Sequence, residues 1–216
     1  MSKDMIIHDI SLTLATGVVV WPKDVPYQRR LRGSIEHGDH SNLSQVNLSA
    51  HTGTHVDAPL HFVPDGYGVD EIPLDHLYGR AYVADCRAMP IVTGDVLREK
   101  VPQGTKRLLL KTDNSQLLGD GQVSFDPDFV YIDQTAAQFI VDQGILLLGM
   151  DYLSIGKPGE INKTVHQLLL GNNVTILETI TLGEIEPGEY FLACGPLKLA
   201  GSDGAPCRVV LIENLI

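Results

Sequence analysis

The segment from His51 to His61 constrains the fold of this chain more than any other part of its sequence. It reads His-Thr-Gly-Thr-His-Val-Asp-Ala-Pro-Leu-His and places three histidines and one aspartate within eleven positions. His51 and His55 have the i, i+4 spacing of a helical zinc motif. A helix is opposed by Gly53, two threonines and Pro59, so these histidines must meet in another backbone conformation if they share a ligand.

A fully extended segment is a second alternative. It would turn His51, His55, Asp57 and His61 to one side, because their numbers are all odd. It would also hold the Cα atoms of His51 and Asp57 roughly 20 Å apart, which metal bonds of about 2 Å cannot bridge. We therefore predict a bent, non-helical loop that turns at Gly53, since glycine tolerates positive φ.

The donor set of this loop indicates a transition metal. Two imidazoles and a carboxylate suit Zn, Mn or Fe. A single histidine or aspartate in a polar loop is more commonly a hydrogen-bonding residue, and that interpretation stays open for each residue alone. Four such residues within eleven positions favour a metal site.

The composition excludes several classes of protein. The 216 residues are 44% hydrophobic and 20% charged, which is typical of a globular chain, and we expect one domain over residues 1–216. The net charge of -11, without a basic run, argues against a nucleic-acid partner, which requires lysines and arginines at phosphates. Neither a signal-peptide core nor an apolar run of roughly 20 residues is present, so we expect a cytoplasmic protein with no membrane partner.

Other catalytic signatures are missing from the sequence. Cys86, Cys194 and Cys207 form no C-x-x-C pair and are odd in number, which predicts reduced and mostly buried thiols. No nucleophile elbow, Walker A loop or G-x-G-x-x-G run occurs. Ser202 lies in a turn-like run without the elbow pattern, and we interpret it as a turn serine.

Short β-like runs and fewer helices follow one another along the chain. Strands are predicted at residues 7–12, 18–21, 45–49, 81–85, 107–111, 145–150 and 174–177, with 45–49 half-buried because it alternates with period two. Helices are predicted to begin near residue 93 and to cover residues 133–144 and 162–170. This mixture predicts an α/β protein with at least one buried sheet.

The histidine segment resembles a family motif. The pattern from His51 to Phe62 is similar to H-x-G-T-H-x-D-x-P-x-H-F of the cyclase family, which includes bacterial kynurenine formamidase and isatin hydrolase. The resemblance extends over nearly the whole chain. It takes in residues 20–24, 147–154 and 195–206, and His166 with Glu178 twelve residues later.

The resemblance implies a role for each matching residue. His51, His55 and Asp57 match a first metal site, and Asp57 also matches a carboxylate that bridges to a second metal. The other ligands of the second metal correspond to His166 and Glu178. His61 matches the proton donor and acceptor of catalysis, and Trp21 matches an aromatic residue that packs on the substrate ring.

The sequence alone would not select three of these residues. A lone histidine in the helix at 162–170 is usually structural, Glu178 could be solvated beyond its strand, and Trp21 could be a core residue. Two departures from the family pattern lie beside the proposed site. Lys23 stands where many relatives have glycine, and Thr179 follows Glu178 where glycine is usual.

The resemblance implies a swivelling β/β/α domain with a mixed β-sheet. It implies a metal-dependent amidohydrolase that cleaves a C–N bond of a small, aryl formamide such as N-formyl-kynurenine, an intermediate of tryptophan catabolism. The expected cofactor is one or two divalent ions, Zn or Mn, and the expected assembly is a homodimer or homotetramer. An isatin-type lactam hydrolase and a non-hydrolytic, metal-dependent cyclase or dehydratase remain alternatives.

Overall fold

Three of the parallel strands are built from residues that are buried on both faces. The computed structural model describes residues 4–118 and 124–215. In β7 (Arg107–Lys111), Leu108 and Leu110 pack toward the helices, whereas Leu109 packs on the opposite side of the sheet. The same alternation in the neighbouring strands gives two cores, one under the helices and one enclosed by the sheet. These strands therefore read as continuous apolar runs.

The main sheet has eight strands in the order β1-β12-β11-β5-β7-β9-β10-β4. Strands β5, β7, β9 and β10 are parallel, and the other pairings are antiparallel. Strand β4 also pairs with β12, which closes seven of the strands into a barrel-like ring. The strands are β1 (Ile6–Asp9), β4 (His55–Asp57), β5 (Tyr78–Asp85), β7, β9 (Leu147–Met150), β10 (Thr175–Glu178), β11 (Gly188–Pro196) and β12 (Gly204–Glu213).

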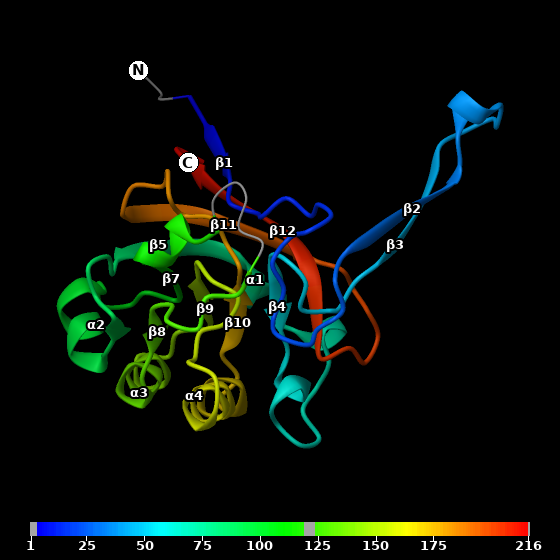
Figure 1. Ribbon diagram of the computed structural model, residues 1–216. Coiled ribbons are helices and arrows are strands. Elements are labelled where there is room, and N and C mark those ends of the chain that lie inside the picture. The colour runs from blue at the N-terminus through cyan, green and yellow to red at the C-terminus, as the bar shows by residue number, and fades with distance from the viewer. Residues whose placement is uncertain (1–3, 119–123, 216) are drawn as a thin grey trace.

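Helices cover one side of the parallel strands. Figure 1 shows α2 (Gly94–Lys100), α3 (Gln134–Asp142) and α4 (Glu160–Gly171) side by side below β7, β9 and β10. The Asp133 side chain caps α3 by accepting from the Ala136 amide, and Gly144 follows the helix at φ 61°. A further helix among the described residues, α1 (Leu74–Leu77), is a single turn. None of the helices in the described residues is long and apolar enough to cross a membrane.

Two short strand pairs and several 3₁₀ turns lie outside the main sheet. Strands β6 (Ile91–Val92) and β8 (Tyr131–Ile132) form a short parallel pair, and β2 (Gln28–Gly33) pairs with β3 (Leu43–Asn47). Figure 1 shows β2 and β3 as an arm that projects from the body. Single 3₁₀ turns cover Ile35–His37, Pro59–His61, Val69–Glu71 and Asp113–Gln116.

The mixed α/β architecture confirms the sequence prediction, with two corrections among the strands. Residues 18–21 form no strand. Val19 is buried in a small apolar cluster, so the apolar run reflects burial and not strand pairing. The strand predicted at 45–49 is β3, and all its residues are exposed rather than half-buried. Apolar and polar residues do alternate along this segment, but no core packs against either face of β3 within the described residues.

Candidate metal centre

Strand β4 places the central donors of the site. It lies between β10 and β12, with His55 opposite Glu178 on one side and Asp57 opposite Gly204 on the other. His55 and Asp57 point to the same face, because they are two residues apart in a strand. Val56 points the other way into the core enclosed by the sheet, so the two donors face the helix-covered side.

The rest of the segment bends as the sequence predicts. Gly53 has φ +67° and a Cβ there would meet Leu14 at 2.4 Å, so the turn before β4 requires glycine. One detail differs from the predicted non-helical loop. Pro59–His61 forms a single 3₁₀ turn that begins with proline, and this turn brings the ring of His61 to 4.1 Å from the ring of His51 in a stacked arrangement.

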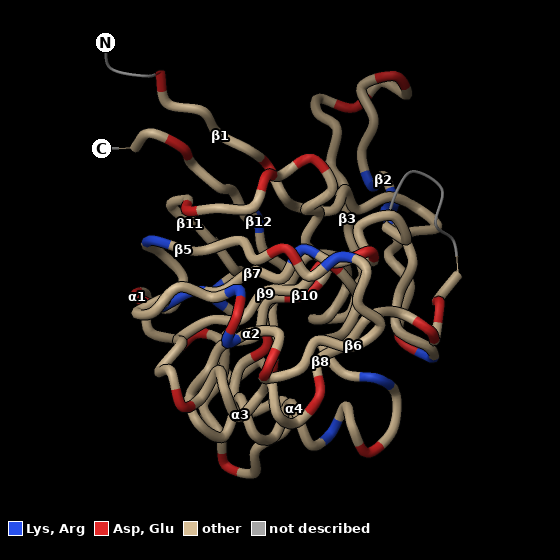
Figure 2. Tube along the Cα trace, turned by 90° about the vertical axis from the view of Figure 1, so that its left-hand side faces the viewer, with Lys and Arg blue, Asp and Glu red and all other residues tan. Residues whose placement is uncertain are grey.

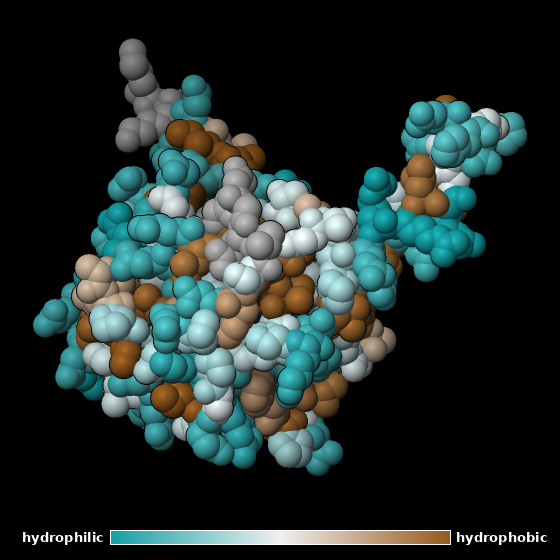
Figure 3. Space-filling view, in the orientation of Figure 1, coloured by the Kyte–Doolittle hydropathy of each residue, from teal (hydrophilic) through white to brown (hydrophobic). Residues whose placement is uncertain are grey.

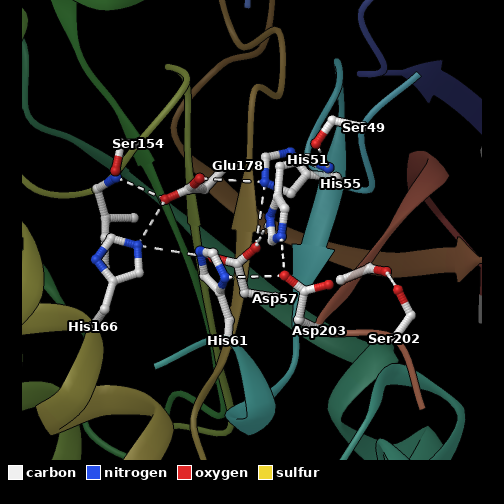
Figure 4. Close-up of polar contacts among 12 residues, drawn as sticks. Ser49, His51, His55, Asp57, His61, Ser154, His166, Glu178, Ser202 and Asp203 are labelled. Carbon is white, nitrogen blue, oxygen red and sulfur yellow. Dashed lines mark hydrogen bonds and ion pairs between the residues drawn. The ribbon is translucent and has the colours of Figure 1, made fainter. Parts of the chain in front are cut away.

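The two oxygens of Asp57 face different donor groups (Figure 4). Oδ1 lies 2.8 Å from His51 Nδ1 and 3.3 Å from His55 Nε2. Oδ2 lies 3.8 Å from His166 Nε2, which is itself 3.3 Å from Glu178 Oε1. His55 Nε2 is also 3.4 Å from Glu178 Oε2. The structure therefore brings together all five residues predicted as metal ligands.

Hydrogen bonds at Nδ1 orient two of the imidazoles so that their Nε2 atoms point into the site. His55 Nδ1 donates to the Gly53 carbonyl at 2.8 Å, and His166 Nδ1 donates to the Asn162 carbonyl at 2.7 Å. Because a carbonyl only accepts, each Nδ1 carries a proton, and each ring directs an Nε2 lone pair inward once Nε2 gives up its proton. Phe62 stacks on the His166 ring at 4.5 Å. Such outer contacts are typical of metal-binding histidines.

Unpaired buried atoms show that the donors fit a divalent cation. His55 Nε2 and Asp57 Oδ2 are buried and have no hydrogen-bond partner in the part of the chain that the structure describes. Buried polar atoms of this kind are costly unless they are paired or bind a ligand. Two ligands of a tetrahedral ion, each at roughly 2.0–2.1 Å, lie about 3.3 Å from each other. The spacings of 3.3 and 3.4 Å around His55 Nε2 match this value.

Charge also favours a cation. Burial acts against the imidazolium form of His51, but the carboxylates of Asp57 and Asp203 outweigh it and raise the pKa of His51 to about 10. Burial is likewise outweighed at His55 by Asp57 and Glu178, and its pKa rises to about 9. These carboxylates thus stabilise the positively charged imidazolium forms of His51 and His55. A bound divalent cation would replace those protons.

Asp203 is a site residue that the sequence analysis missed. Its Oδ2 lies 2.9 Å from His51 Nε2 and 3.3 Å from His61 Nδ1, and the His51 contact lowers its pKa to about 2. It lies next to β12, 152 positions from His51, so no local spacing connects them. Only the family likeness of residues 195–206 marked its segment. Ser202 donates to the Gly204 carbonyl, which confirms it as a turn serine.

His61 and Trp21 take less central positions. The His61 side chain is 28% exposed, and burial lowers its pKa. Its position near His51 and Asp57 would also allow it to bind a metal. Trp21 is half-buried and contacts Phe125 and Phe129 edge-on, with ring centroids 4.9 and 6.5 Å away. Its role toward a substrate stays a prediction.

Both departures from the family pattern occupy left-handed backbone. Lys23 has φ 77° and Thr179 has φ 60°, a region that favours glycine and is strained for a β-branched residue. Thr179 is fully buried and its hydroxyl has no partner among the described residues. The strain therefore lies directly after Glu178.

We expect Thr179→Gly to raise the melting temperature. Relief of the left-handed strain and removal of the unpaired hydroxyl outweigh the added chain entropy, and the net gain of about 1 kcal/mol corresponds to roughly 2–4 °C in a chain of this size. The control is Thr181→Gly, at a position without positive φ, which should lower the melting temperature. If calorimetry showed an equal fall in melting temperature for both variants, Thr179 would not be strained.

A closed mixed sheet that gathers four imidazoles and three carboxylates at one centre, with His61 and Asp203 at its exposed edge, defines a candidate binding protein for divalent metal. The Cyclase family model matches residues 8–157. The chain therefore belongs to the cyclase family.

Similar proteins cover most of the chain. Cyclase-like protein 2 of Oryza sativa subsp. japonica is 37% identical over 190 residues, which cover 85% of this chain and 70% of that protein. Kynurenine formamidase of Bacillus cytotoxicus is 30% identical over 204 residues, which cover 94% and 95%. These relatives support the family over nearly all of the sequence.

Solved structures share the fold. A potential metal-dependent hydrolase with cyclase activity has a TM-score of 0.84 at 30% identity, covering 97% of this chain and 98% of that chain. Isatin hydrolase A from Labrenzia aggregata has a TM-score of 0.81 at 23% identity, covering 97% and 94%. The fold expected from the family resemblance is confirmed.

Proposed function

We propose that this chain is a cytoplasmic, metal-dependent amidohydrolase that cleaves the C–N bond of a small aryl formamide such as N-formyl-kynurenine. One observation carries the proposal: the two oxygens of the buried Asp57 face different imidazoles, Oδ1 toward His51 and His55 and Oδ2 toward His166, and Glu178 lies beside both His55 and His166. The kynurenine formamidase relative, matched over 95% of its length, supports the formamide as substrate.

The ligands divide into two groups around Asp57. His51 and His55 would hold one Zn or Mn ion with Asp57, and His166 and Glu178 would hold a second ion with the other Asp57 oxygen. A divalent ion in such a site supplies Lewis acidity and lowers the pKa of a coordinated water from 15.7 to about 7. The Ile155 amide donates to Glu178 Oε1 at 2.9 Å and holds that carboxylate in place.

His61 would move the proton. With Nδ1 directed at Asp203, its Nε2 is left to give a proton to the departing nitrogen, and imidazole suits this task because its ordinary pKa is near neutral pH. Asp203 would orient both His61 and His51. Trp21 would pack on the aryl ring of the substrate, beside the apolar cluster that contains Tyr152 and Leu153.

A substrate panel on metal-loaded protein tests the proposal. We expect hydrolysis of N-formyl-kynurenine, followed by absorbance, to exceed isatin opening, to stop after chelation and to return with added Zn or Mn. Faster opening of isatin would make the chain a lactam hydrolase. Bound metal without hydrolysis of either compound would favour a non-hydrolytic cyclase or dehydratase.

A further inference from the structure

The hydroxyl of Thr54 connects segments of the chain that flank the metal centre. Its Oγ1 atom donates to the Thr179 carbonyl at 2.5 Å and accepts from the Leu12 amide at 2.8 Å. Thr54 directly precedes His55, and Thr179 directly follows Glu178. The hydrogen bond between the two threonines therefore joins the neighbours of two proposed ligands.

The pairing of β4 with β10 ends at these two ligands. In the antiparallel register the last pair is His55 opposite Glu178. The next residue of the second strand, Thr179, has φ 60° and has left the extended conformation. The end of a strand pair is where local opening is easiest. The side-chain bond from Thr54 takes the place of the backbone pair that is missing there.

Water has little access to these contacts. Thr54 is 3% exposed and Thr179 is fully buried. A hydroxyl can donate one hydrogen bond and accept others, and Thr54 does both, while its own carbonyl accepts from the Cys207 amide of β12 at 2.9 Å. Loss of the hydroxyl would deprive a buried carbonyl and a partly buried amide of this partner, which is unfavourable.

We infer that Thr54 is a positioning residue whose hydroxyl holds His55 and Glu178 at the spacing that the metal centre requires. His55 Nε2 and Glu178 Oε2 are 3.4 Å apart, and with Asp57 they present ligand atoms within 4.8 Å of one another. Opening of the strand ends would widen this spacing beyond the reach of metal bonds of about 2 Å. The inference rests on the metal centre proposed above.

The metal affinity of Thr54→Val tests this role. Valine keeps the branched shape and removes the hydroxyl. We expect the dissociation constant for Zn or Mn, measured by competition with a chromogenic chelator, to rise about 10- to 100-fold, as is typical when an outer partner of a metal ligand is lost. Thr54→Ser keeps the hydroxyl and should retain an affinity near that of the wild type.

Thr175→Val is the matched control for a general loss of stability. Thr175 lies on the same strand as Glu178, is 2% exposed and forms a hydrogen bond with His76, which is not a proposed ligand. Both valine variants lose a buried hydroxyl and should lower the unfolding temperature of the metal-free protein. Only Thr54→Val should also lose metal affinity.

Neither valine substitution alters the outer surface. Both threonines are buried and valine is uncharged, so the charged residues coloured in Figure 2 and the surface in Figure 3, with its projecting arm, stay as they are. A change in metal affinity would therefore originate in the interior.

A double variant keeps the test valid if Thr54→Val alone does not fold. Thr179→Gly retains the carbonyl that Thr54 contacts, so it should keep wild-type metal affinity, and the stability expected from the glycine offsets the loss at Thr54. The double variant should bind metal as weakly as Thr54→Val.

Two results would overturn the positioning role. One is wild-type metal affinity in the folded Thr54→Val or double variant, and the other is an equal loss of affinity in Thr175→Val. Wild-type protein that binds no metal at this centre would be a different result, because it would overturn the proposed function and the inference together.

Discussion

Asp57→Ala is expected to lose bound metal and activity together. Asp57 is the carboxylate common to both donor groups and its side chain is fully buried, so its loss removes a ligand from both groups at once. Loss of the Lewis acid removes several kcal/mol of stabilisation, which corresponds to a fall of about 10³-fold or more in kcat/KM. Elemental analysis and turnover on the same preparation measure both effects.

Two further variants separate metal loss from misfolding. Asp57→Asn keeps the side-chain shape and removes the anion, so it should fold while losing metal. Glu71→Ala removes an exposed acid from the same part of the chain and should keep both metal and rate. If Asp57→Ala retained full metal content and full turnover, the bridging role of Asp57 would be wrong.

His61→Ala is expected to keep its metal and lose most of its turnover. A positioned general acid or base contributes about 10²–10⁴-fold, and we expect kcat to fall within that range while metal content and unfolding temperature are unchanged. The physical reason is that His61 lies at the exposed edge of the site, against Asp203, whereas the five proposed ligands remain, four of them buried.

The same variant decides between two roles that the geometry allows. His51, Asp57 and His61 present ligand atoms within 4.8 Å of one another, so His61 could bind a metal directly. A parallel loss of metal and rate in His61→Ala would assign it as a ligand. Asp203→Asn serves as a companion, because it weakens the orientation of His61 and also removes the anion that contacts His51, so its metal content has to be measured beside its rate.

Apolar runs in the sequence predicted which segments are buried, but they did not always predict which segments pair as strands. The run at 107–111 predicted β7 because buried strands need apolar residues on both faces. The similar run at 18–21 is buried without strand pairing, and hydrophobicity does not distinguish the two cases. Strands β11 and β12 were not predicted. Each contains a glycine or proline, such as Pro196 and Pro206, and such residues normally mark turns or strand edges.

The site was predictable only where its residues are close in sequence. The segment from His51 to His61 carries its own chemistry, and Gly53 marks its bend. His166 and Glu178 came from family spacing alone. Asp203 escaped prediction because it reaches His51 only when β12 pairs with β4 and closes the ring, which is a long-range event that no local pattern records.

The most direct test of the central claim is anomalous X-ray scattering from crystals of wild-type protein loaded with Zn or Mn. We expect a peak at bonding distance from an Asp57 oxygen, bounded by His51 and His55, with any second peak at the other oxygen beside His166 and Glu178. Full-occupancy metal located elsewhere, with these five side chains free of it, would contradict the assignment of the metal centre.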